Sequence, residues 1–163
     1  YVEVTGLTAA DVKGTGTWPY AASPLGKILK NHLPKKVSLK LPETIEGLTD
    51  MTACFLECEN LVSVANIPSG VTDMEACFNS CIKLTQGPDI PSSVTNIQTC
   101  FDGCTKLQKV KINCNYDNLF ANQAFRGCGD LKNGGIKVPP GQLSTYQIKA
   151  PTMETNNNKF SGF

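Results

Sequence analysis

The chain has 163 residues, the size of one ordinary domain, and 40% of them are hydrophobic, which is enough to build a core. A formal net charge of +1 excludes a general electrostatic attraction to nucleic acid or to anionic membranes. No apolar run is long enough to span a bilayer. The sequence opens with Tyr1 rather than methionine and shows no leader pattern, so we expect a mature or trimmed chain, which points to secretion.

Residues 1–35 precede the periodic part of the chain. Tyr1-Val-Glu-Val predicts a short strand, and Ser23 and Pro24 are the N-cap and first residue of a predicted helix that ends at Pro34. The apolar residues of this helix fall on one face at spacings of three and four: Leu25, Ile28, Leu29 and Leu33.

Three five-residue segments recur further along the chain: Cys54-Phe-Leu-Glu-Cys58, Cys77-Phe-Asn-Ser-Cys81 and Cys100-Phe-Asp-Gly-Cys104. Their first cysteines are 23 residues apart. A fourth copy, Ala124-Phe-Arg-Gly-Cys128, follows 24 residues later and has alanine in place of the first cysteine. This period is typical of a leucine-rich solenoid, in which each repeat buries its apolar face only by stacking on its neighbours.

Each repeat divides into a strand and a return segment. Val37-Ser-Leu-Lys-Leu41 predicts the first strand of the array, and the leucine-to-isoleucine segments of the later repeats predict the next ones. Proline then ends strand pairing, and Cys-Phe-x-x-Cys fits one helical turn. We therefore predict an α/β fold: a right-handed leucine-rich repeat solenoid with short strands on its concave face, short helical turns opposite, and caps at both ends.

This reading makes residues 1–163 a single domain. We expect an N-terminal cap over 1–35, repeats of about 23 residues over 36–139, and a C-terminal cap over 140–163. Trp18 is expected to cover the first repeat, and Phe160 and Phe163 the last one. Residues 140–150 predict a short helix with three partly buried side chains: Leu143, Tyr146 and Ile148.

The repeat resembles the bacterial cell-surface leucine-rich repeats of the BspA-like type, which run L-x-x-I-x-I-P-x-x-V-x-x-I-x-x-x-A-F-x-x-C. The resemblance covers roughly residues 28–150, and Phe120-Ala-Asn-Gln-Ala-Phe-Arg-Gly-Cys128 fits the spacing closely. The middle copies hold one extra residue before the proline and one fewer before the Cys-Phe pair. The resemblance implies a secreted or surface-anchored interaction protein, often described as an adhesin, that binds a protein or glycan on a host or bacterial surface. It transfers no ligand residues.

Seven of the eight cysteines fall in two columns of the repeat, and three interpretations compete for them. They can be small core residues, disulfides between neighbouring repeats, or zinc ligands supplied by two Cys-x-x-x-Cys units. A phenylalanine beside every first cysteine and the unreplaced loss of cysteine at Ala124 favour core thiols, with no metal site. The expected core positions are Cys54, Phe55, Cys58, Cys77, Phe78, Cys81, Cys100, Phe101, Cys104, Phe125 and Cys128.

No catalytic residues can be assigned, because no nucleotide-binding, hydrolase or metalloprotease motif is present. His32 is the only histidine, so we expect a partly buried cap residue rather than a ligand. We predict a non-catalytic binding module without a cofactor, monomeric and with no nucleic-acid partner. The alternatives are a structural spacer and a cysteine-rich metal-binding solenoid. Stepping along the repeat places the candidate ligand-binding stripe on the concave face at Lys40, Ser63, Gln86, Lys109 and Lys132.

Overall fold

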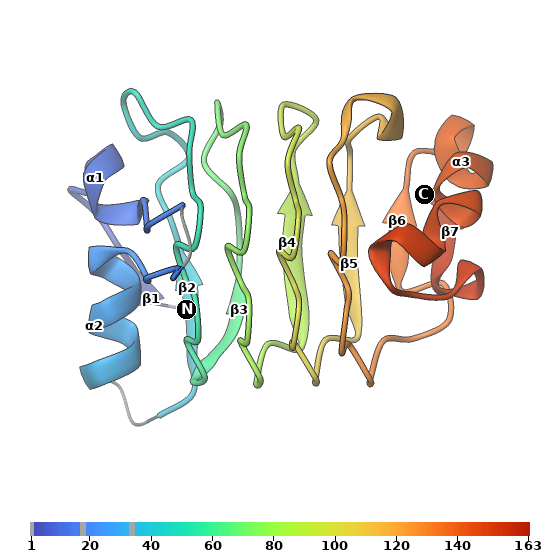
Figure 1. The fold of residues 1–163 in the computed structure, drawn as a ribbon. Helices are drawn as coiled ribbons and strands as arrows, with labels where there is room; N and C mark the ends of the chain where they lie inside the picture. Colours follow the sequence, from blue (N-terminus) through green and yellow to red (C-terminus); the bar gives the residue numbers. More distant parts are fainter. Residues whose placement is uncertain (1, 17–18, 33–34) are drawn as a thin grey trace.

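The computed structural model describes residues 2–16, 19–32 and 35–163, and its strands lie side by side like the rungs of a ladder (Figure 1). The seven strands among these described residues form one parallel sheet, and their order in space is their order in the chain. The repeating parallel solenoid predicted from the period is therefore confirmed. The strands are β1 (Val2–Glu3), β2 (Val37–Lys40), β3 (Leu61–Val64), β4 (Gln86–Ile90), β5 (Lys109–Ile112), β6 (Ile136–Val138) and β7 (Phe160–Gly162).

The α-helices are short and lie at the two ends of the row (Figure 1). Trp18, Leu33, Pro34 and the side chain of His32, all singled out in the sequence, lie outside the described part of the structure. The α-helices are α1 (Ala9–Val12), α2 (Pro24–His32) and α3 (Leu143–Ile148), and the 3₁₀ helices are η1 (Tyr116–Asn118), η2 (Pro140–Gln142), η3 (Ala150–Met153) and η4 (Asn157–Lys159).

The return segments opposite the strands are β-turns, so the expected helical turns are wrong. In the first repeat Cys54, Leu56 and Cys58 donate their N–H groups to the carbonyl three residues earlier. Ala53, directly before Cys54, and Glu57 adopt left-handed backbone conformations with φ of 50° and 57°, which a right-handed helix does not accommodate. The same two positions are left-handed in every later copy: Ala76 and Ser80, Thr99 and Gly103, Gln123 and Gly127.

The remaining N–H groups of these turns bond to the next rung. Phe55 N–H donates to the Cys77 carbonyl at 2.8 Å, Phe78 to Cys100 at 2.9 Å, and Phe101 to Ala124 at 3.0 Å. The turn side of the solenoid, which we call the turn face, is thus bonded from rung to rung much as the strands are. Neighbouring repeats are held at sheet-like spacing on both sides of the core.

This spacing stacks equivalent side chains inside the array. The rings of Phe55, Phe78, Phe101 and Phe125 form one continuous column, with neighbouring centroids 5.3, 5.4 and 5.7 Å apart. All four rings are buried, and the last two contacts are nearly coplanar, with an angle of 2° between rings. The column therefore joins four rungs into one core.

The structure leaves all eight cysteines as free thiols, seven of them buried and Cys128 partly so. One of the two cysteine columns forms a second ladder between rungs. Cys81 Sγ donates to the Phe55 carbonyl at 3.0 Å, Cys104 to Phe78 at 3.0 Å and Cys128 to Phe101 at 3.1 Å. Cysteine suits this column because it is small enough for a tight core and still carries a weak donor.

At the amino-terminal end, α2 packs on the first turn segment. Ser23 Oγ caps this helix by accepting the Gly26 N–H at 3.0 Å, and it donates to the Cys54 carbonyl at 2.9 Å. A Cβ at Gly26 would lie 2.1 Å from that same carbonyl oxygen, so only glycine permits this approach. Leu25 is buried, whereas Ile28 is 55% exposed, which corrects the broader apolar face expected from spacing.

The carboxyl-terminal end extends the sheet as well as covering it. Phe160 is buried on β7, which pairs with β6, while Phe163 is 51% exposed. Tyr146 of α3 is buried and donates its hydroxyl to the Cys114 carbonyl at 3.1 Å. Ile148, expected to be partly buried, is 74% exposed because α3 turns that side away from the sheet.

Replacing one ring tests the phenylalanine column. We expect Phe78→Ala to lower the free energy of unfolding by about 3–5 kcal/mol, since it removes a fully buried ring and its two stacking partners. Phe120→Ala is the matched control, because Phe120 is 72% exposed and its loss is expected to cost less than about 1 kcal/mol. Urea unfolding measures both, and equal costs would contradict a stacked interior.

The thiols are expected to be free in solution. Titration in denaturant without reductant should count close to eight reactive thiols, and in the folded chain most of them should react slowly because they are buried. A count of four or fewer in denaturant would show that the columns are joined by disulfides.

Alkaline pH should weaken the fold. Burial raises the pKa of Cys58 and of Cys128 from 9.0 to about 12, so each binds its proton more tightly in the folded chain. The free energy that these two neutral thiols contribute to folding is fully present below pH 9 and is lost as pH rises toward 12. The free energy of unfolding falls by at most about 1.4 kcal/mol per pH unit for each thiol. Urea unfolding between pH 8 and 11 measures this slope. Cys58→Ala should reduce the slope, and an unchanged slope would contradict the prediction.

Candidate functional site

The outward side chains of the sheet form a surface that we call the strand face. Along β5, Val110 and Ile112 point into the core, whereas Lys109 and Lys111 point outward. The parallel register carries this alternation from strand to strand, so outward residues gather in rows across the rungs. One row is Ser38, Ser63, Gln86 and Lys109, and a second holds Asp89, Lys111, Lys137 and Ser161.

The structure brings together only part of the stripe expected from the sequence. Ser63, Gln86 and Lys109 are register partners in one row. Lys40 lies two residues further along its strand, and Ser38 occupies the first position instead, 2.8 Å from Ser63 between hydroxyl oxygens. Counting back by 23 failed here because the first step of the array is 25 residues long.

The second row was missed because the sequence reasoning followed one position per repeat. Alternation within β5 gives the signal that could have found it, since Lys111 stands two residues after Lys109. Lys132, the last member of the expected stripe, lies before β6 in a loop, where its N–H donates to the Gln108 carbonyl at 3.1 Å.

A groove of about 370 Å³ crosses the strand face over β4, β5 and β6. It contains three residues of the expected stripe, Gln86, Lys109 and Lys132, together with Lys111 and Lys137 from the second row. A smaller hollow of about 180 Å³ continues it over β3 and includes Lys40 and Ser63. The two hollows share Gln86, Gly87 and Asp89, so they form one polar surface that we call the strand-face groove.

The carboxyl-terminal half of the groove carries a surplus of positive charge. Four lysines and one aspartate line it, a formal excess of three charges. Lys111 Nζ lies 3.9 Å from an Asp89 oxygen and 4.2 Å from the centroid of the Phe163 ring. Within the described part of the chain, Lys109, Lys132 and Lys137 make no ion pair.

At the other end of the strand face, the positive charge of the lysine is paired with a carboxylate. Lys40 Nζ lies 2.8 Å from a Glu3 oxygen, and this hydrogen-bonded carboxylate raises the pKa of Lys40. Ser63 donates its hydroxyl hydrogen to the Ser38 hydroxyl. Free charge on this face is therefore concentrated over β5 and β6.

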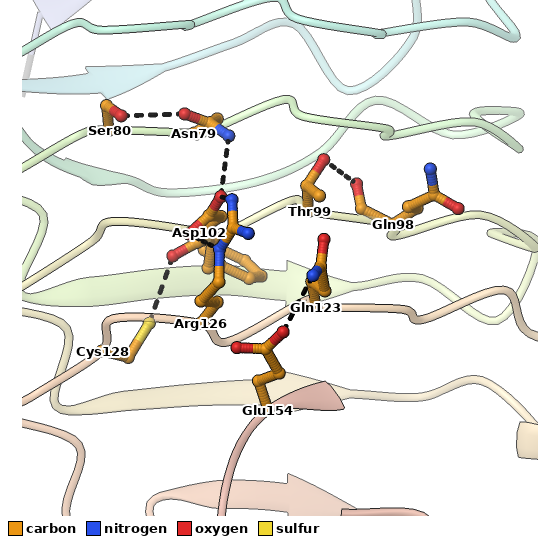
Figure 2. A network of polar contacts seen from close by, with 10 residues as sticks. Asn79, Ser80, Gln98, Thr99, Asp102, Gln123, Arg126, Cys128 and Glu154 are labelled. Carbon is orange, nitrogen blue, oxygen red and sulfur yellow. Dashed lines mark hydrogen bonds and ion pairs between the residues drawn. The ribbon is translucent and has the colours of Figure 1, made fainter. Parts of the chain in front are cut away.

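The turn face presents polar groups that largely satisfy one another (Figure 2). Arg126 bonds both oxygens of Asp102 on the neighbouring rung, one of them at 2.9 Å. Asn79, one rung further back, reaches the same carboxylate at 3.5 Å and accepts from Ser80 at 2.8 Å. Gln123 donates to Glu154 at 2.8 Å. The side-chain contacts of Asn79, Gln123 and Arg126 join each rung to the segment stacked on it, so these groups have a structural role.

A larger hollow, of about 620 Å³, lies away from the strand face where the loop containing η1 meets the preceding repeat. Phe120 borders it at the position held by Asp50, Asp73 and Asn96 in earlier repeats. Those side chains each accept a backbone N–H two residues later, which phenylalanine cannot do. The hollow lacks a charged cluster, so we consider the strand-face groove the better candidate site.

In the part of the chain that the structure describes, no three histidine, cysteine, aspartate or glutamate side chains are grouped so as to hold a metal ion. The cysteine columns lie in the core, and the column of Cys81 and Cys104 directs its thiols at backbone carbonyls. None of the helices among the described residues is long and apolar enough to cross a membrane.

Comparison with curated proteins gives no match, and comparison with solved structures gives none either. The family model of the BspA type leucine-rich repeat region matches residues 31–151 in six copies. This match confirms the resemblance read from the Cys-Phe-x-x-Cys repeats. Repeats of this family are in general non-catalytic, suggest an interaction or surface module, and are typical of surface or extracellular proteins. With the repeating parallel sheet, the match shows that the chain belongs to the BspA-type leucine-rich repeat family.

Proposed function

We propose that the chain is a non-catalytic adhesion or interaction module of a secreted or cell-surface protein, and that its ligand binds in the strand-face groove. The observation that carries this proposal is the groove itself, where polar side chains of several rungs face one hollow of about 370 Å³. This volume falls within the range of ordinary ligand sites. The expected stripe residues Gln86, Lys109 and Lys132 all border it.

The strand face suits a ligand better than the turn face for an energetic reason. A side chain already paired with a protein partner must lose that contact before it binds something else. On the turn face Asp102 is held by Arg126, and Glu75 accepts the Tyr20 hydroxyl at 2.5 Å. Lys109 and Lys137 on the strand face form no ion pair with any residue that the structure describes, so they have none of these contacts to lose.

Two alternative functions, a spacer and a metal-binding solenoid, would require different features of the structure. A spacer would hold another domain at a distance and would need no hollowed, charged surface. A metal-binding solenoid would need thiolates, but burial raises the pKa of Cys81 and of Cys104 and so favours the neutral thiol. Both observations support a binding surface over the alternatives.

The finer architecture is part of the same proposal. We take residues 1–163 as one monomeric domain in which segments 1–35 and 140–163 cap repeats 36–139. The array is right-handed, because connections between parallel strands of one sheet follow that hand almost without exception. The support for the caps is local: α2 packs on the first turn segment and Tyr146 of α3 bonds the Cys114 carbonyl.

Blocking the groove without changing charge tests the proposal. The immobilised chain is screened against extracellular matrix proteins and a panel of glycans, and every binder is measured again with Gln86→Trp. We expect Gln86→Trp to weaken binding at least about tenfold, because the new ring fills the groove. Asn122→Trp is the matched control, since Asn122 is also exposed but lies in a turn segment.

Two results would overturn the proposal. If no member of the screen binds the wild-type chain, the spacer function is favoured. If Asn122→Trp weakens binding as much as Gln86→Trp, or only Asn122→Trp does so, the ligand binds elsewhere. Thermal unfolding of both variants excludes loss of the fold as the cause.

A further inference from the structure

We infer that the ligand of the strand-face groove is an anionic polysaccharide, whose carboxylate or sulfate groups bind the lysines over β5 and β6. This inference rests on the proposed function and adds the chemical class of the ligand. It follows from three features: a local surplus of unpaired positive charge, its confinement to one end of the groove, and the polar groups that surround it.

The lysines are close enough to act on one ligand. Lys111 and Lys137 are register partners on neighbouring strands, so their backbones lie about 4.8 Å apart. Lys109 stands two residues from Lys111 on the same side of β5, about 7 Å away along the strand. Ammonium groups at this separation repel one another, and an anion placed among them relieves the repulsion.

The surplus is local rather than a property of the whole chain. The formal net charge of the protein is only +1, yet the groove lining carries an excess of three positive charges. Lys40 at the other end is neutralised by Glu3, and among the described residues of the lining only Asp89 is acidic. A charged concavity of this kind concentrates anions from solution and speeds their association.

The surroundings of the lysines favour a sugar chain over an acidic protein. Gln86, Gln108 and Asn133 bring side-chain amides to the same lining, and amides both donate to and accept from hydroxyl groups. Cores of protein interfaces are instead rich in aromatic anchors and poor in lysine. Among the described residues, none of those lining the groove is aromatic, and the half-exposed Phe163 ring beside it already has Lys111 Nζ 4.2 Å from its centroid.

Soluble polymers of matched size provide the test. The probes are polygalacturonate and dextran sulfate as anionic sugars, dextran as a neutral sugar, and polyglutamate as an acidic peptide. We expect the two anionic sugars to bind and dextran not to bind. Their affinity should fall steeply as salt is raised from about 50 to 300 mM, because exposed charges are screened.

Substituting the unpaired lysines locates the site. The triple variant Lys109→Gln, Lys132→Gln, Lys137→Gln should lose about tenfold or more in affinity for the anionic sugars. The control Lys27→Gln, Lys35→Gln, Lys36→Gln removes the same charge from exposed lysines elsewhere and should change affinity less than about twofold. The triple variant Lys109→Arg, Lys132→Arg, Lys137→Arg keeps the charges and should retain binding.

The outcomes separate this inference from the proposed function. Equal losses in the two triple glutamine variants would mean attraction to net charge only and would overturn the inference. Polyglutamate binding as tightly as the anionic sugars would overturn it in favour of an acidic peptide. A neutral ligand that binds and is lost with Gln86→Trp would leave the proposed function standing and refute the anionic class. A chain that binds no probe and no member of the screen refutes both.

Discussion

Hydrogen bonds between successive rungs are the constraint from which the rest of this structure follows. One repeat of about 23 residues satisfies few of its backbone groups alone. The strands bond on one side, as when Val110 donates to Gly135 at 3.0 Å, and the turns bond on the other, as when Phe55 donates to Cys77 at 2.8 Å. With both sides fixed at this spacing, equivalent side chains of neighbouring repeats have to lie one above another. The phenylalanine column and the thiol ladder are both consequences.

The period of the sequence was sufficient to predict this stacking, but it did not predict the shape of the turns. In a helical turn, side chains at positions i, i+1 and i+4 point to one side. Consecutive β-turns bury residues at the same spacing here, namely Cys54, Phe55 and Cys58, so the spacing of buried residues does not distinguish a helix from β-turns. Left-handed residues distinguish the two structures. Gly103 and Gly127 indicate such a conformation in the sequence, because glycine favours positive φ. Glu57 and Ser80 occupy the equivalent positions with φ of 57° and 59°, and their residue types give no such indication. Bonds to the next rung hold these residues in a conformation that costs isolated side chains about 1 kcal/mol or more.

The candidate site was predictable only as far as the repeats are regular. A step of 23 residues joins Ser63, Gln86 and Lys109 correctly, since those repeats have equal length. It fails at Lys40 because a 25-residue step and a register shift after Val37 place Ser38 in the row instead. At the other end, Lys132 reaches the groove from a loop, where no strand periodicity applies. Irregular repeats therefore limit sequence-based placement of surface residues more than placement of the core.

A regular backbone also determines where specificity can arise. The row Ser38, Ser63, Gln86, Lys109 presents the same backbone at each rung, so only its side chains distinguish one end from the other. They change from hydroxyl to amide to ammonium along the array, and Lys137 and Lys111 reinforce the last step. The electrostatic potential therefore rises in one direction across the sheet. If a polymer with its acidic groups at one end binds in the groove as we propose, it would bind in one orientation, because the side chains differ between repeats while the backbone does not.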